Sequence, residues 1–163
     1  MITQKELKEV LNYNPKNGLF TWKIKANKDR NIGSVAGSKN KKGYVIIGYD
    51  RKTYLGHRLA HLYMLGEFPK NQIDHKDHIK HNNKWKNLRE VTNQENHKNM
   101  TIQKNNKSGH IGVSFNKEKN KFQSYITVNN KKINLGYYVE LNSAIYARKQ
   151  AETKYNFYKN HGI

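Results

Sequence analysis

The stretch IDHKDHIKHNNKWKNLREVTNQEN, residues 73–96, places carboxylate, imidazole and amide groups in a segment with little apolar content. Its beginning reads as the end of a strand that carries Asp74 and His75, and residues 87–91 return as a second strand. Residues 76–85 between them are too polar to be core and are expected to form a loop. The segment is therefore predicted to be a β-hairpin built around polar side chains.

A helix is expected to follow the hairpin. Thr92 and Glu95 have the spacing of a capping box, which predicts a helix that starts at about Asn93. Asn96 then lies in the first turn, where its side chain can point back toward the strand that bears Asp74. Carboxylate and amide oxygens are hard ligands, so Asp74 and Asn96 together predict a site for one Mg²⁺ or Mn²⁺ ion, with open positions for water and phosphate oxygens.

His75 follows Asp74 directly and is expected to point to the other side of the strand. Its ordinary pKa is about 6.5, so a neutral imidazole there could take a proton from water. A metal ion beside it would stabilise the charge that develops on a phosphate and on the departing 3′ oxygen. These roles together predict hydrolysis of a phosphodiester.

The joint spacing of these residues resembles the HNH endonuclease family, specifically its phage and intron homing branch of the ββα-metal (His-Me finger) type. The resemblance is carried by four short motifs, which are DH at 74–75, NN at 82–83, NLR.VT at 87–92 and EN at 95–96. It implies that His75 is the general base and that Asp74 and Asn96 are the metal ligands. It also implies that Asn87 braces the loop.

Other positions match or depart from the family pattern. The sequence HRLA, residues 57–60, resembles the helix that precedes the site in these proteins, and His57 is interpreted as structural. The family often has Asp-Gly where this chain has Asp77 and His78, a departure that bears on the tight geometry of the loop. Glu90 occupies a position where the family often has Trp.

A zinc site formed by His75, His78 and His81 is an alternative interpretation of the same loop. Against it, the predicted loop offers no helical face on which ligands could be spaced, and the chain has no cysteine. His78 and His81 are expected to face solvent or DNA phosphates instead.

The charge of the chain favours nucleic acid as a partner. Among its 163 residues, 31 Lys and Arg stand against 12 Asp and Glu, for a net charge of +19, and the basic residues are interleaved with 11 Tyr. Residues 1–100 contain 20 basic and 9 acidic side chains, and residues 101–163 contain 11 and 3. Each part could therefore contact phosphates independently.

Composition also excludes several classes. Because there is no cysteine, disulfides, zinc ribbons and thiol catalysis are ruled out. The first residues, MITQKELKEVL, lack the apolar segment of a signal peptide, and no run approaches the ~20 apolar residues that span a bilayer. We therefore expect a cytoplasmic protein with no membrane partner.

The N-terminal part predicts short helices and strands. Thr3 and Glu6 fit a capping box that starts a short helix, from about residue 4 to Leu11, and NYNPKNG after it is expected to be a turn. LFTWKI reads as a strand, and GYVIIGY and TYLG read as a hairpin around Asp50 and Arg51. HRLAHLYML is expected to be a helix that packs on this hairpin and ends at Gly66.

The C-terminal part reads as a second domain. Residues 99–109 lose periodicity and gain Asn, Lys, Ser and Gly, so domains 1–100 and 101–163 are divided there. HIGVSF, KFQSYITV and KKINLGYY alternate apolar and polar residues, and they predict a three-stranded antiparallel sheet with a tight turn at residues 129–130. A helix capped by Asn142 follows. The fold class is α+β, with this sheet and helix after the ββα-metal domain.

The second domain resembles the AP2/ERF-type DNA-binding domain, in which a three-stranded sheet enters the major groove and a helix backs the sheet. The anchors of the resemblance are Gly112-Val113, Lys121-Phe122, Leu135-Gly136 and the Ala-rich helix. Alternation predicts that the helix covers Phe122, Ser124, Ile126 and Val128. The opposite face is either an ordinary solvated surface or a DNA-binding surface. Its candidate DNA-binding residues are Ser114, Asn116, Gln123, Tyr125, Thr127, Lys132 and Asn134.

Two functions of different classes follow. The first is a metal-dependent DNA endonuclease of homing type that hydrolyses a phosphodiester in duplex DNA, with the second domain binding the target site. The alternative is a non-catalytic DNA-binding regulator whose HNH half has become a scaffold. RNA binding would require a preference for single strands. We expect one ion per site, double-stranded DNA as the partner, and a monomer or a DNA-induced dimer. The gene is expected to belong to a phage or mobile element.

Overall fold

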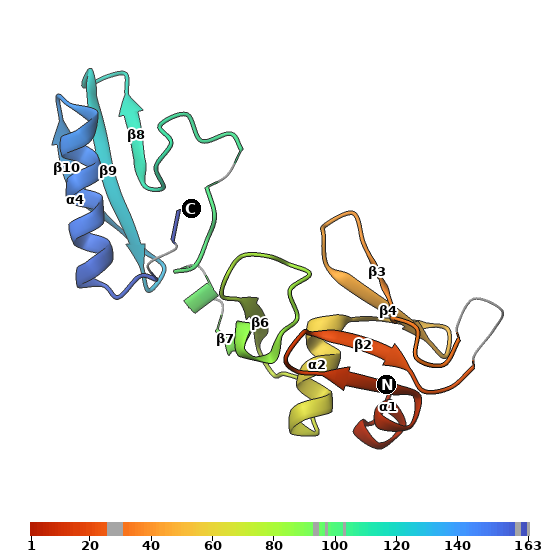
Figure 1. Cartoon of the computed structure of the whole chain (residues 1–163). Coiled ribbons are helices and arrows are strands. Elements are labelled where there is room, and N and C mark those ends of the chain that lie inside the picture. The colour runs from red at the N-terminus through yellow and green to blue at the C-terminus, as the bar shows by residue number, and fades with distance from the viewer. Residues whose placement is uncertain (26–30, 93–94, 97, 103, 159–160, 163) are drawn as a thin grey trace. The chain divides into compact units, whose positions relative to one another are not determined.

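The computed structural model describes residues 1–25, 31–92, 95–96, 98–102, 104–158 and 161–162. The chain divides into two compact units, Met1–Val91 and Thr92–Ile163, and each is a mixture of helices and small antiparallel sheets (Figure 1). The functional boundary expected between residues 100 and 101 stays a prediction. Among the described residues, no helix is long and apolar enough to cross a membrane.

The first unit begins with helix α1 (Gln4–Val10), whose start is closed by the predicted capping box of Thr3 and Glu6. Strand β1 (Leu11–Asn14) follows at once and pairs with β2 (Leu19–Trp22). The sequence predicted β2, but it placed Leu11 at the end of the first helix and expected a turn over residues 12–18. The strand forms because its alternating side chains, Leu11 and Tyr13, are both buried.

A three-stranded sheet in the order β3-β4-β5 comes next, with β3 (Ser38–Lys39), β4 (Val45–Tyr49) and β5 (Lys52–Leu55). The predicted hairpin turn is confirmed, because Asp50 and Arg51 both have left-handed backbone angles, with φ of 48° and 55°. Helix α2 (Gly56–Leu65) packs on β4 and β5 and ends at Gly66, whose φ is 88°. That end was predicted.

The hydrophobic core of the first unit joins α1, β1, β2, β4 and α2. Its fully buried side chains include Leu7, Leu11, Phe20, Ile47 and Leu59. The core is connected to the polar loop that follows β6, since the hydroxyl of Tyr13 donates to the carbonyl oxygen of Asn83 at 2.7 Å. The turn between β1 and β2 also lies against this loop, because a Cβ added at Gly18 would collide with the backbone of Asn83 and Lys84. The loop after β6 is therefore held in place by contacts with β1 and with the β1–β2 turn.

The last elements of the first unit are strands β6 (Gln72–His75) and β7 (Leu88–Val91), which form the predicted antiparallel hairpin. Asn87, expected at the start of the second strand, lies instead in a short 3₁₀ helix, η1 (Trp85–Asn87). The turn of this helix is closed by the amide of Asn87, which donates to the carbonyl oxygen of Lys84. The difference decides where the Asn87 side chain points.

The second unit starts with the capping box of Thr92 and Glu95, in which both side chains bond the partner's backbone amide. Residues 95 and 96 are helical, as predicted, but the expected helix start at Asn93 lies outside the described residues.

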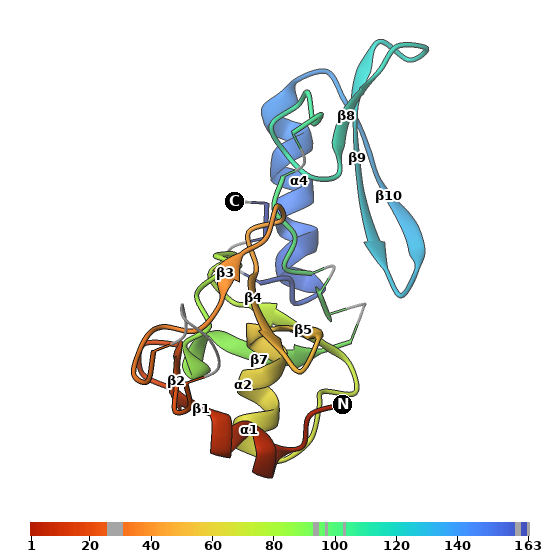
Figure 2. The ribbon, with the colours of Figure 1, turned by 90° about the vertical axis from the view of Figure 1, so that its right-hand side faces the viewer.

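A three-stranded antiparallel sheet in the order β10-β9-β8 forms the body of the second unit, with β8 (Val113–Asn116), β9 (Lys121–Val128) and β10 (Lys131–Tyr138). Residues 129 and 130 make the predicted tight turn, with φ of 51° and 59°. Helix α4 (Leu141–Lys154) packs along β9 and β10 (Figure 2). Ser124 and Ile126 beneath it are fully buried, so the predicted covered face is confirmed at these positions.

The start of α4 corrects one expectation. Glu140, not Asn142, is the N-cap residue, with an extended backbone at φ −99° and ψ 139°. Glu140 makes no side-chain capping bond, so the helix begins without the cap that the sequence suggested. Asn142 lies inside the first turn instead. Packing of the small residues Ala144 and Ala151, both buried, holds this helix.

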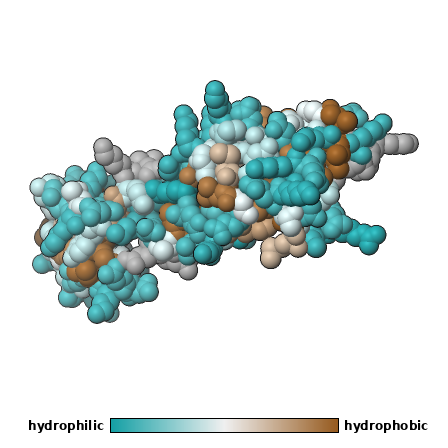
Figure 3. Space-filling model, turned by 90° about the horizontal axis from the view of Figure 1, so that it is seen from below, coloured by the Kyte–Doolittle hydropathy of each residue, from teal (hydrophilic) through white to brown (hydrophobic). Residues whose placement is uncertain are grey.

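The surface agrees with the basic, polar composition. On the face shown in Figure 3, hydrophilic residues cover most of the surface, and hydrophobic ones form small, separate patches.

Candidate functional site

His75 ends β6 and is buried, with 5% of the residue exposed. Its Nε2 lies 3.0 Å from the side-chain oxygen of Asn83, which is itself only 1% exposed. An amide oxygen can only accept a hydrogen bond, so this contact requires the proton on Nε2. The lone pair of the neutral ring is then on Nδ1, which is the nitrogen that could accept a further proton.

Two aromatic neighbours pack around His75. The ring of His57, from α2, meets it edge to face at a centroid distance of 5.2 Å, and the ring of Tyr44 lies 6.1 Å from His75 and 5.3 Å from His57. Burial is the main cause that lowers the pKa of both histidines, and it lowers that of His57 to about 4, with further help from the charges of His75 and Arg58. Both rings are therefore neutral at pH 7. Among the described residues, no group bonds His57 Nδ1 or the side-chain nitrogen of Asn83.

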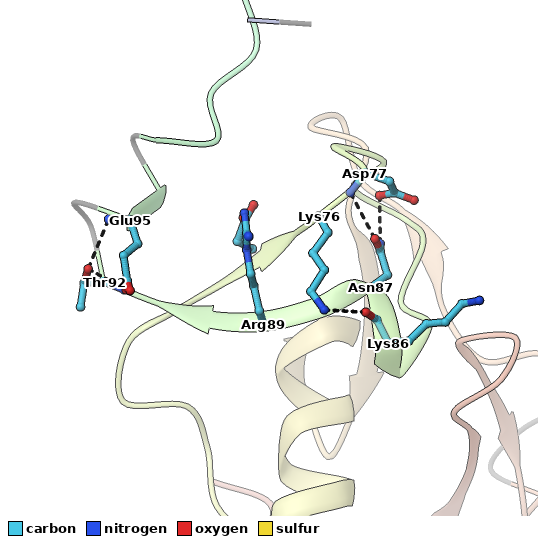
Figure 4. A network of polar contacts seen from close by, with 8 residues as sticks. Lys76, Asp77, Lys86, Asn87, Arg89, Thr92 and Glu95 are labelled. Carbon is cyan, nitrogen blue, oxygen red and sulfur yellow. Dashed lines mark hydrogen bonds and ion pairs between the residues drawn. The ribbon is translucent and has the colours of Figure 1, made fainter. Parts of the chain in front are cut away.

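Asn87 holds the loop after β6 together from within (Figure 4). Its side-chain nitrogen donates to Asp77 Oδ1 at 2.9 Å and to the carbonyl oxygen of Asn82 at 2.8 Å, and its oxygen accepts from the amide of Asp77. Burial would raise the pKa of Asp77, but the hydrogen bonds from Asn82, Ile79 and Asn87 outweigh it, and the pKa is lowered. Asp77 is thus an ionised centre of the loop, a role that the sequence did not suggest.

The turn at residues 77–78 forms although this chain has His78 where the resemblance suggested glycine. His78 takes a left-handed backbone with φ of 61°, the region where glycine is usually found. The amide of His78 donates to the carbonyl oxygen of His75 at 2.9 Å, which closes the turn. Histidine is one of the non-glycine residues that enter this region more often than most. The substitution is therefore accommodated at a backbone cost.

Asp74 is paired with Arg89, a residue that the sequence did not single out. The two are direct partners across the β6–β7 ladder, and Arg89 donates to Asp74 Oδ2 from Nε at 2.9 Å and from Nη2 at 2.5 Å. Their side chains are 10% and 18% exposed. The signal that could have found the pair is the hairpin register, which opposes residue 74 to residue 89 once the hairpin is accepted.

A carboxylate oxygen is a hard ligand of the kind that Mg²⁺ and Mn²⁺ prefer, and in this structure the Asp74 carboxylate is paired with Arg89. The expected second ligand, Asn96, belongs to the second unit and is half-buried there. Its approach to Asp74 stays a prediction. In the described part of the chain, no group of three or more His, Asp or Glu side chains gathers as a metal site, so these residues offer no zinc triad.

Glu90, at the position where Trp was expected from the resemblance, has a definite role in holding the hairpin. It accepts from the backbone amide of Asn71 at 2.6 Å and lies 3.1 Å from Nε2 of His61, whose other ring nitrogen contacts the carbonyl oxygen of Glu67. These contacts connect α2, β7 and the chain before β6.

The predicted polar loop, residues 76–85, is exposed or half-buried except at Asn83. Asn83 and the two residues that flank the loop region, His75 and Asn87, are 1%, 5% and 8% exposed. They can be buried because each has hydrogen-bond partners inside the unit. These three polar side chains are therefore fixed in position, while most of the loop between the strands faces solvent.

All seven predicted DNA-binding residues of the second unit lie on one face of its sheet. Direct partners in an antiparallel pair share a face, and the register joins Ser114 to Gln123, Tyr125 to Asn134 and Thr127 to Lys132. Asn116 follows Ser114 by two residues and has the same orientation. The ammonium of Lys132 lies over the ring of Tyr125, 3.8 Å from its centroid.

A β-bulge adds a residue to this face that alternation alone would have misplaced. The register between β9 and β10 shifts between Asn134 and Gly136, where Gly136 has φ of 129°. Tyr137 is thereby paired with Gln123 on the open face, with the ammonium of Lys119 3.8 Å from its ring centroid. The Leu135-Gly136 pair was the available signal, because a glycine inside a strand often marks a bulge.

Residues 54–98 of the chain match the HNH endonuclease family. This segment runs from the end of β5 through α2 and the β6–β7 hairpin.

One solved structure, described as "DNA binding and cleavage by the HNH homing endonuclease I-HmuI", is similar with a TM-score of 0.41 and 29% sequence identity. The similarity covers 53% of this chain and 49% of that chain, so it extends over about half of each. No curated protein matches this chain.

Proposed function

We propose that the chain is a metal-dependent DNA endonuclease of the homing type, which hydrolyses one phosphodiester of duplex DNA at a ββα-metal site. The observation that carries the proposal is His75. It is a buried, neutral imidazole whose Nε2 is held by Asn83 and whose Nδ1 retains a lone pair, beside the carboxylate of Asp74. The match of residues 54–98 to the HNH endonuclease family supports it.

The roles of the side chains follow from their chemistry. His75 would accept at Nδ1 the proton of the attacking water, while Asn83 and the ring of His57 keep the imidazole oriented. Asn87 would keep the loop shape on which that orientation depends. Asp74 and Asn96 would hold one Mg²⁺ or Mn²⁺, and the chemistry supplied there is stabilisation of negative charge on the phosphate and the departing oxygen.

The second unit would bind the target DNA in the manner of an AP2-like sheet. The seven residues that share its open face are polar or basic, and Tyr137 and Lys119 extend the same face. A groove of duplex DNA admits a β-ribbon, and lysines at its edges neutralise phosphates. One such site cuts one strand, so a double-strand break would need a DNA-induced dimer or a second visit.

The second candidate is a non-catalytic DNA-binding regulator. The observation that favours it is the ion pair of Asp74 with Arg89, because an expected metal ligand there already has a cationic partner. On this alternative the polar hairpin would be a scaffold, and the positively charged surface would bind DNA without cutting it.

A nicking assay on supercoiled plasmid separates the two candidates. The wild-type chain should nick in Mg²⁺ or Mn²⁺ and stop in EDTA. His75→Ala should lower the rate by about 10²- to 10⁴-fold while DNA binding persists, as expected for loss of a general base. His81→Ala, an exposed histidine in the same loop, is the matched control and should stay near wild type.

Full activity of His75→Ala would refute the assignment of the base. An absence of nicking by the wild-type chain with every divalent metal tried would favour the regulator.

A further inference from the structure

The ion pair between Asp74 and Arg89 carries a consequence for metal binding. Two hydrogen bonds of the guanidinium, from Nε and Nη2, fall on the same carboxylate oxygen, Oδ2. The pair is mostly removed from solvent, with the two side chains 10% and 18% exposed, so salt and water screen it little. The Asp74 carboxylate is therefore already paired with the positive charge of Arg89.

The geometry of the hairpin fixes this partner. Residues 74 and 89 are directly opposed in the β6–β7 register, so the two Cβ atoms are held close before any side chain moves. On the same hairpin, the ammonium of Lys76 donates to the carbonyl oxygen of Lys86 at 2.8 Å (Figure 4). Arg89, directly across the ladder from Asp74, is bonded to its carboxylate.

A divalent ion that binds Asp74 meets this guanidinium at short range. A neutral hydrogen-bond donor next to a metal ligand orients it and strengthens metal binding. A guanidinium also orients the carboxylate, but its full charge repels a dication, and the repulsion is large in a half-buried site. An arginine pairs with a phosphate as well as with a carboxylate, in the same forked geometry.

We infer that Arg89 is a resident counter-ion that competes with the divalent metal for Asp74, and that a DNA phosphate relieves this competition by drawing the guanidinium to itself. The inference rests on the proposed function, since it takes Asp74 as a metal ligand. Metal binding and DNA binding are then coupled, so each tightens the other by the same factor. The site loads its metal well only when DNA is present.

The test is a Mn²⁺ titration of the full chain, followed by electron paramagnetic resonance of the free ion, with and without a mixed-sequence DNA duplex. Without DNA, Arg89→Gln should bind Mn²⁺ about tenfold more tightly than wild type, because a neighbouring positive charge has been removed. The duplex should tighten Mn²⁺ binding by the wild-type chain and have little effect on Arg89→Gln. Arg89→Lys, which keeps the charge, should stay near wild type.

Two further variants keep the interpretation specific. Lys86→Gln removes a positive charge from the same hairpin without removing a contact to Asp74, and it should change Mn²⁺ affinity by less than about twofold. Asp74→Asn combined with Arg89→Gln should lose the tightening. Tryptophan fluorescence checks folding, because both tryptophans of the chain, Trp22 and Trp85, lie in the first unit.

Weaker or unchanged Mn²⁺ binding by a folded Arg89→Gln would overturn the inference and would make Arg89 a purely orienting partner. An equal gain in Lys86→Gln would also overturn it, because the effect would be one of general charge. The plasmid assay is read separately. If wild type nicks DNA while Arg89→Gln gains no Mn²⁺ affinity, the inference fails and the nuclease proposal stands. If wild type does not nick DNA while Arg89→Gln gains Mn²⁺ affinity, the nuclease proposal fails and Arg89 still competes with the metal for Asp74.

Discussion

The β6–β7 hairpin and the β8–β9–β10 sheet are both rich in polar side chains, but they hold them in opposite ways. In the hairpin, His75, Asn83 and Asn87 are buried and bonded to partners fixed by the fold. On the sheet, the polar residues of the open face lie at or near the surface, and Lys132 and Tyr125 contact each other.

On the proposed function, this difference separates the part of the chain that would carry out the reaction from the part that would bind DNA. A reacting group must be held in one orientation, and buried hydrogen bonds provide that at the expense of tolerance to change. A surface that binds a polymer of phosphates gains from many exposed groups, none of which needs a fixed position. Single substitutions in the hairpin should therefore cause large losses of nicking and stability, whereas single substitutions on the sheet should cause small, graded losses of DNA affinity.

After the loss of the base in His75→Ala, the largest effect is expected for Asn87→Ala. The change leaves Asp77 and the carbonyl oxygen of Asn82 without their buried donor, so nicking should fall by about 10²-fold or more as the loop loses its geometry. The free energy of unfolding should fall by about 1 to 3 kcal/mol. Plasmid nicking and urea unfolding followed by tryptophan fluorescence measure the two. Lys86→Ala, an exposed neighbour, is the control. Near-normal nicking by Asn87→Ala would show that the loop does not depend on this buried donor.

The next effect is the acid sensitivity of the first unit. The pKa of His57 is about 4 in the folded chain, below its ordinary 6.5, because burial opposes its charge. The unfolded chain therefore binds more protons between these values, and stability is lost as the pH falls from 6.5 toward 4. The expected loss is about 3 kcal/mol over that window.

Urea unfolding at pH 7 and pH 5, read by tryptophan fluorescence, should show about 2 kcal/mol of this loss. His57→Gln should flatten the pH dependence, whereas His81→Gln, an exposed histidine, should leave it unchanged. An unaltered slope in His57→Gln would show that another group causes the acid sensitivity.

On the sheet, a smaller and more uniform effect is expected. Lys132→Ala should weaken duplex binding by about 3- to 10-fold and reduce the slope of log affinity against log salt by about 1, because one phosphate contact is lost. Tyr146→Ala, on α4 and 66% exposed, is the control and should bind as wild type. Fluorescence anisotropy at several salt concentrations gives both quantities, and an unchanged slope for Lys132→Ala would remove this residue from the interface.

The smallest effect, and the one in the opposite direction, is expected for His78→Gly. Residue 78 has a left-handed backbone, so glycine should relieve strain and raise the free energy of unfolding by about 0.5 to 1 kcal/mol with no loss of nicking. His81→Gly, where φ is ordinary, should lower stability instead. A loss of stability in His78→Gly would mean that the histidine side chain stabilises the turn.

Much of the fold was predictable from local pattern. The capping boxes at Thr3 and Thr92 and the turn at residues 129–130 are set by contacts within a few residues, and each is present in the structure. Strand β1 was missed because its signal is only four residues long and lies beside a turn motif. The α4 cap was misplaced because packing against the sheet, not a side-chain cap, sets where that helix begins.

The candidate site divides in the same way. Motif spacing singled out Asp74, His75 and Asn87, but it gave no sign of Asn83 Oδ1 on His75 or of Tyr44 beside His57. His57 and Tyr44 come from α2 and the β3–β4 turn, which are distant from His75 in sequence, whereas Asn83 lies in the loop that follows His75. The bulge that turns Tyr137 onto the open face also depends on pairing between strands. Local reasoning cannot supply contacts that arise only when separate segments pack.

By itself, the sequence determined most of the elements and their order, the basic character of both units and which side chains are candidates for the site, because these depend on composition and short-range periodicity. Only the tertiary structure decided which nitrogen of His75 keeps its lone pair, which cation neutralises Asp74 and which side chains share the open face of the sheet. Hydrogen-bond direction, ion pairing and strand register are properties of groups brought together by packing, and no single segment of the chain contains them.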